Sequence, residues 1–212
     1  MVNLAQILRY RFIAPIGELF IVEKSELKSP PVALQQIAVA FRLAGWASFW
    51  VQLVLGVVST LVLIFASLGR DIATQGQRST GTGIGIVFAV SGIITLGIGG
   101  YIAFRYTRIG KRLQSTNPSN RPRKADTVQI LRLGLIVNLV GTLLTILGAQ
   151  AIAGILLLRS LSLPQGFGAA IYNPQQVIRP VDIFVVQANT NTVAAHFAGL
   201  IATLFLLNRV TK

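Results

Sequence analysis

Four long stretches without a charged residue constrain this chain of 212 residues more than any other feature. They cover residues 43–69, 79–104, 133–158 and 183–208, and hold 27, 26, 26 and 26 residues. A membrane-spanning helix needs roughly 20 apolar residues, and 26 residues rise about 39 Å in an α-helix. The sequence therefore predicts an all-α integral membrane four-helix bundle, with spans at about 44–68, 83–104, 133–158 and 183–208.

The composition excludes several classes of function. The net charge of +13 is typical of nucleic-acid-binding proteins, but only 12% of the residues are charged and 53% are hydrophobic. A soluble domain has about twice that charged fraction, so neither a nucleic-acid partner nor a soluble enzyme is expected. The absence of cysteine excludes disulfides and thiolate metal sites. Because the spans hold no nucleophile–base or carboxylate pair, we predict no enzymatic activity and no resident cofactor.

The positions of the basic residues predict the orientation. Residues 1–42, 105–132 and 209–212 hold 15 of the 19 lysines and arginines. The positive-inside rule places these three segments, and so both termini, in the cytoplasm. The basic loop 105–132 is also predicted to dock anionic lipid or an acidic partner. The candidate docking residues are Arg108, Lys111, Arg112, Arg121, Arg123 and Lys124.

The N-terminal residues 1–42 are predicted to form an interfacial segment ahead of the transmembrane domain at 43–212. Residues 12–22 are apolar but too short to span a bilayer, and they contain Pro15 and Gly17. We expect an amphipathic helix that lies at the membrane surface. Pro30 and Pro31 indicate the start of a second helix, which leads into the first span.

Small residues recur at helical spacing within the spans. Glycines lie seven residues apart in the second span, at 85, 92 and 99, and in the third, at 134, 141 and 148. Apolar lipid tails provide no hydrophobic force between helices, so membrane helices associate through small residues and hydrogen bonds. This pattern predicts a tight left-handed bundle, and a pore lined by small residues is the alternative.

The fourth span carries a polar face, on which Asp182, Asn189, His196 and Thr203 are spaced by seven. His196 is the fourteenth of 26 residues and lies near the bilayer midplane. It is a candidate metal ligand or proton carrier, or a packing residue bonded to Thr145 or Gln52. One histidine makes a poor zinc-type site, so a metal route would need His196 from several copies of the chain, or a hydrated ion that passes amides and hydroxyls. The candidate polar path comprises His196, Asp182, Asn189, Asn191, Gln187, Gln52, Asn138 and Gln150.

Four stretches of the chain resemble a known family. They are Phe49-Trp50-Val51-Gln52-Leu53-Val54; Tyr106-Thr107-Arg108 with Arg112-Leu113; Pro122-Arg123-Lys124-Ala125-Asp126 through Val137-Asn138 to Leu147-Gly148-Ala149-Gln150-Ala151; and Asp182-Ile183-Phe184 through Val186-Gln187-Ala188 and Asn191-Thr192 to His196-Phe197 and Gly199-Leu200. This pattern is similar to a cyanobacterial and plastid family of four-helix membrane proteins, filed as a domain of unknown function. Its plastid member is called permease in chloroplasts and is also described as a component of the inner-envelope protein translocon.

The resemblance implies two functions of different kinds. The first is a permease or channel-type subunit for metal ions, with iron as the expected cargo, working as a homo-oligomer or with partner membrane subunits. The second is a non-transporting accessory or scaffold subunit for protein translocation or complex assembly. Because the chain begins near the domain without a long acid-poor presequence, we expect a cyanobacterial protein of the plasma or thylakoid membrane.

Overall fold

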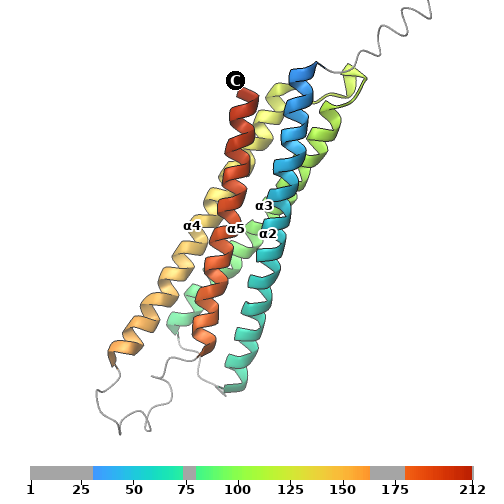
Figure 1. Ribbon diagram of the computed structural model, residues 1–212. Coiled ribbons are helices and arrows are strands. Elements are labelled where there is room, and N and C mark those ends of the chain that lie inside the picture. The colour runs from blue at the N-terminus through green and yellow to red at the C-terminus, as the bar shows by residue number, and fades with distance from the viewer. Residues whose placement is uncertain (1–30, 74–79, 163–179, 212) are drawn as a thin grey trace, which may run out of the picture.

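A computed structural model describes residues 31–73, 80–162 and 180–211, and the predicted surface helix at 12–22 lies outside these ranges. The described chain forms four long helices and one short turn of 3₁₀ helix (Figure 1). They are α2 (Val32–Ala73), α3 (Thr80–Leu113), η1 (Pro118–Asn120), α4 (Lys124–Ser162) and α5 (Pro180–Thr211). The helix α2 runs unbroken from the expected start beside Pro31 through the whole first span.

All four helices are long and apolar enough to cross a membrane. The prediction of an all-α four-helix integral membrane protein is therefore confirmed. Helix α2 packs beside α3 and α5, and α4 packs beside the same two helices, so that α2 and α4 lie diagonally across the bundle. The beginning of α2, the connection between α3 and α4 and the end of α5 lie at one end (Figure 1). We call this the basic end, and its location in the cytoplasm stays a prediction.

The connection between α3 and α4 is tied by side chains to the backbone. The side-chain oxygen of Asn117 accepts hydrogen bonds from the backbone N–H of Ser119, at 3.0 Å, and from its hydroxyl, at 2.8 Å. The guanidinium of Arg121 donates two bonds to the carbonyl of Ser115, at 2.9 and 3.0 Å. Arg121 is half-buried, so among the six predicted docking cations it is engaged within the connection itself. The other five are exposed: Arg108, Lys111, Arg112, Arg123 and Lys124.

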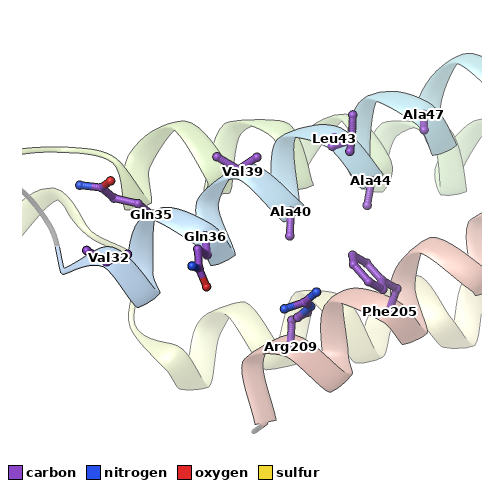
Figure 2. A pocket seen from close by; sticks show the side chains of 10 residues that line it. All are labelled: Val32, Gln35, Gln36, Val39, Ala40, Leu43, Ala44, Ala47, Phe205 and Arg209. Carbon is purple, nitrogen blue, oxygen red and sulfur yellow. The ribbon is translucent and has the colours of Figure 1, made fainter.

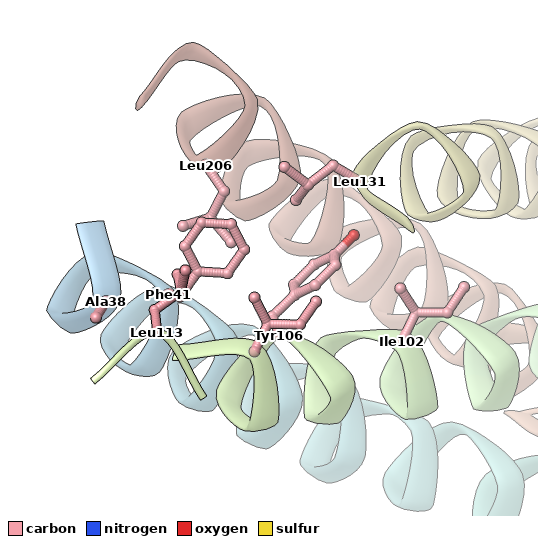
Figure 3. Packing of buried hydrophobic residues seen from close by; sticks show 8 residues of the cluster. Ala38, Phe41, Ile102, Tyr106, Leu113, Leu131 and Leu206 are labelled. Carbon is pink, nitrogen blue, oxygen red and sulfur yellow. The ribbon is translucent and has the colours of Figure 1, made fainter. Parts of the chain in front are cut away.

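Two apolar clusters lie at different heights in the bundle. The larger, the basic-end cluster, packs side chains of all four helices around the rings of Phe41 and Tyr106, which meet edge to face (Figure 3). Its buried members are Ala38, Phe41, Ile102, Tyr106, Ile109, Leu113, Leu131 and Leu206. The smaller, the opposite-end cluster, consists of Ala66, Ile152 and Val185. The polar side chains of the interior lie mainly between these two clusters.

Candidate functional site

His196 is completely buried at the centre of the bundle. Its Nε2 lies 3.1 Å from the backbone carbonyl oxygen of Gly92 on α3, and its Nδ1 lies 3.3 Å from Oδ1 of Asn138 on α4. Both partner atoms are carbonyl oxygens, which only accept, so a neutral imidazole donates to one of them, and the tautomer decides which. The partners proposed from the sequence, Thr145 and Gln52, are wrong.

Thr145 makes its hydrogen bond within its own helix. The Oγ1 atom donates to the carbonyl of Gly141, one turn back in α4, at 2.7 Å. Threonine in a helix commonly makes this bond to its own backbone. The hydroxyl therefore ties α4 to itself rather than α4 to α5.

The side-chain amides of Gln52 and Asn138 extend this site to α2. Gln52 Nε2 donates to Ser48 Oγ at 3.1 Å and lies 3.5 Å from Asn138 Oδ1. Asn138 Nδ2 in turn donates to the carbonyl of Gly134 at 2.9 Å. Gly92, Asn138, His196 and Gln52 thus bring one polar group from each of the four helices to one point, which we call the central polar site.

The side chains of the central polar site fit inside the bundle because glycines of the neighbouring helices face them. A Cβ atom added at Gly141 would collide with the imidazole of His196, and one added at Gly199 would collide with the amides of Gln52 and Asn138. A Cβ at Gly99 would lie 3.0 Å from both Gln52 Oε1 and Asn138 Oδ1. The small residues predicted to let helices approach each other therefore also make room for polar side chains.

Two polar atoms within the bundle lack a hydrogen-bond partner in the described structure. They are Oε1 of Gln52 and Nδ2 of Asn189, and both residues are at most 2% exposed. Leaving such a group buried and unsatisfied costs about 1–3 kcal/mol. These atoms are available to a water molecule or to a passing polar species.

The polar side chains predicted on α5 are buried as expected, but they do not form one continuous column. Asp182, Asn189, His196 and Thr203 are all at most 2% exposed. Val185 and the opposite-end cluster separate Asp182 from Asn189. At the other end, Thr203 lies 3.2 Å from the Tyr106 hydroxyl, beside the basic-end cluster.

Three other residues of the predicted path lie away from the central polar site. Gln150 and Gln187 are exposed on the outside of the bundle, and Asn191 is half-buried. The Gln187 amide donates to Asn191 Oδ1 at 3.2 Å, one turn along α5. Since successive helix residues turn by about 100°, Gln150 points away from Gly148 and Ile152, which face the interior.

Two further contributors to the interior, Ser59 and Tyr106, lie outside the candidate polar path predicted from the sequence. Ser59 donates to the carbonyl of Ala188 at 2.9 Å and links α2 to α5. The hydroxyl of Tyr106 occupies the space over Gly134, where a Cβ would collide with it. The glycine row marks the face of α4 that a neighbouring helix approaches, but it does not indicate that Tyr106 fills the space at Gly134.

The donors near His196 could contact a metal cargo but form no multidentate centre. In the described part of the chain, no three residues of the His, Cys, Asp and Glu types lie together as metal ligands. One imidazole, two amides and a backbone carbonyl suit a weak, transient contact better than a resident metal. The assignment of His196 as a metal ligand stays a prediction.

Comparison with known proteins places the chain in a family. The family profile described as "Protein of unknown function (DUF3611)" matches residues 31–211. The chain is also 31% identical over 195 residues to Protein TIC 21, chloroplastic, of Arabidopsis thaliana. That match covers 90% of this chain and 63% of the relative, so the chain spans slightly less than two thirds of the curated relative's length. No solved structure matches the chain. With the profile covering nearly all of the four-helix domain, the chain belongs to the DUF3611 family.

Proposed function

We propose that the protein is a permease or channel-type membrane subunit that passes metal ions, iron above all. The observation that carries the proposal is the central polar site, where His196, Gln52 and Asn138 meet at the middle of the bundle. The family resemblance supplies the cargo, because its plastid member is linked to iron uptake. The proposal includes no enzymatic activity and no resident cofactor, and it places the protein in a cyanobacterial plasma or thylakoid membrane.

The energetic cost of the buried polar groups favours transport over packing alone. Interhelical hydrogen bonds in membranes contribute about 0.6 kcal/mol on average, and glycine contacts can hold helices together without them. The interior nevertheless buries Asp182, His196 and the amide groups of three residues, two of which have an unpaired atom. Ionisable and polar groups inside a membrane mark substrate pathways by default.

Under this proposal the structure is a closed form, with an apolar cluster on each side of the central polar site. The opposite-end cluster lies between Asp182 and Asn189, and the basic-end cluster lies beyond Thr203. Transport therefore requires the helices to separate at both clusters, or a second copy to complete the path. Homo-oligomers or partner subunits are part of the proposal for that reason.

Replacing His196 by glutamine should reduce metal flux at least tenfold. The expected loss corresponds to about 1.4 kcal/mol of transition-state stabilisation, close to the value of a hydrogen bond to a charged group. The measurement is Fe²⁺ entry into liposomes that contain the purified protein and a trapped fluorescent chelator, under reducing conditions. Thr190→Ala is the matched control, because Thr190 is an exposed polar residue of the same helix. Equal flux for wild type, His196→Gln and protein-free liposomes would refute transport.

A second candidate, the accessory or scaffold subunit, is favoured by how tightly the interior is filled. His196 and the Gln52 and Asn138 amides occupy spaces left by glycines on neighbouring helices, as a permanently closed bundle would require. The five exposed cations at the basic end then provide the docking surface for a partner. Relatives of this family linked to protein import make this the alternative to test.

The scaffold function predicts that charge neutralisation at the basic end releases partners. Changing Arg108, Lys111, Arg112, Arg123 and Lys124 to glutamine should lower the apparent mass of the native complex extracted in mild detergent. Arg121 stays unchanged, because it holds the connection through Ser115. The control changes Arg108, Arg112 and Arg123 to lysine, which keeps the charge. A complex of unchanged mass in the glutamine variant would contradict a docking role for this surface.

A further inference from the structure

A groove between α2 and α5 at the basic end has a volume of about 760 Å³. Figure 2 shows its wall on α2 facing Phe205 and Arg209 on α5. Ligand pockets commonly measure about 300–1,000 Å³, so the groove can hold the head group and upper part of one lipid chain. Neither the central polar site nor the connection between α3 and α4 lines it.

The polar residues of the lining, Gln35, Gln36 and Arg209, lie toward the outer end of the groove, together with Val32. Gln36 and Arg209 lie at the end of the bundle, where the charge-free stretches of α2 and α5 have ended (Figure 2). Toward the bilayer centre the lining becomes Ala40, Ala44 and Phe205. The alanines leave space against α2, because their side chains end at Cβ. This order of a polar head and an apolar path matches an amphiphile.

The charge of the groove selects an anion. The guanidinium of Arg209 lies 5.4 Å from the centre of the Phe205 ring, a cation–π distance. Within the described structure, no acidic side chain lines the groove or pairs with Arg209. A second copy of the chain is a poor occupant, since this end of the molecule is dominated by cations such as Arg42 and Arg105.

We propose that this groove is a binding site for one anionic phospholipid, with the phosphate at Arg209 and Gln36 and an acyl chain along Ala40, Ala44 and Phe205. Binding in this groove differs from the general attraction of cations to the bilayer surface, because one defined site selects a phospholipid by the charge of its head group. The bound lipid would join α2 to α5 at the end where the groove separates them. The site does not depend on which of the two proposed functions is correct.

The two tryptophans of the chain, Trp46 and Trp50, provide a natural reporter. Trp50 lies one turn of α2 beyond Ala47, which lines the groove, and its side chain is 53% exposed. The full-length protein is reconstituted in phosphatidylcholine with increasing brominated phosphatidylglycerol, or with brominated phosphatidylcholine. Bromine quenches the fluorescence of nearby indoles, so the two titrations give the relative affinity of the two head groups.

The wild type should prefer phosphatidylglycerol by about fivefold, the effect of one cation near an anionic group. Arg209→Gln should abolish this preference, and Ala47→Phe should do so by filling the groove. Arg105→Gln removes an exposed cation outside the groove, and Ala153→Phe enlarges an exposed alanine of α4, so both controls should keep it.

Adding inorganic phosphate at matched ionic strength should leave the preference unchanged. A preference that phosphate removes would show a free-phosphate site and overturn the proposal. A preference that survives both Arg209→Gln and Ala47→Phe, or that Arg105→Gln removes equally, would also overturn it.

Discussion

The substitution Gly141→Ala should destabilise the protein by about 2 kcal/mol, within the range for overpacking a tight interior. Gly154→Ala, thirteen residues along the same helix, should be neutral or stabilising by up to about 1 kcal/mol, because alanine restricts the unfolded chain. The two variants add the same methyl group to α4. Their opposite effects should appear as opposite shifts of the thermal unfolding midpoint in detergent.

The physical difference between the two glycines is what each faces. A Cβ at Gly141 would meet the imidazole of His196, whose two ring nitrogens contact Gly92 and Asn138, so the ring cannot move aside without losing these contacts. A Cβ at Gly154 would meet nothing within 4 Å. Gly97, on α3, is equally open and provides a second control. Equal shifts for Gly141→Ala and Gly154→Ala would contradict the packing described for the central polar site.

The fold could be predicted from the sequence because the length of each uncharged stretch can be read directly from consecutive residues. A bilayer excludes charge from about 20 consecutive residues of each helix, and four such stretches admit few architectures. The glycines spaced by seven likewise predicted which faces of α3 and α4 point inward. Gly92 and Gly141 both face the interior in the structure.

The membership of the site was predicted less well, because the depth of a residue in the membrane does not give its angle around the helix. Gln150 was included in the candidate polar path, but it is two residues from Gly148 and therefore points about 200° away. Asn138 follows Gly134 by four residues and shares its face, as its burial confirms. Combining depth with the glycine faces would have kept Asn138 and removed Gln150.

The hydrogen-bond partners of His196 required the structure. Its Nε2 bonds to the backbone of Gly92, and no side-chain pattern marks which carbonyl will face a neighbouring helix. A Cβ at Gly92 would collide with Thr145, so this glycine lets α3 approach α4, and the His196 side chain reaches its carbonyl from α5. The position of a glycine in the sequence shows where helices can approach, but only the relative rotation of the two helices decides which atoms meet.

Opening the basic-end cluster should raise metal flux if the protein is a permease subunit. Phe41 is fully buried and stacks edge to face on Tyr106, with ring centres 6.4 Å apart. Phe41→Ala removes one of the two largest side chains of the basic-end cluster. Lowering the barrier by about 1.4 kcal/mol would increase Fe²⁺ entry into liposomes on the order of tenfold. Phe197→Ala is the control, since Phe197 is 58% exposed on the outside of α5.

The double variant separates a specific path from a simple leak. If ions pass the central polar site, His196→Gln should lower the raised flux of Phe41→Ala, because the two positions act in series. A flux that is raised equally with and without His196 would mean that the loosened bundle leaks. Leu206→Ala in the same cluster provides a milder opening if Phe41→Ala fails to give a folded protein by size-exclusion chromatography. If the protein is a permanently closed scaffold, no folded variant should pass ions. Flux through the Phe41→Ala variant therefore distinguishes the two functions more sharply than the His196→Gln variant alone.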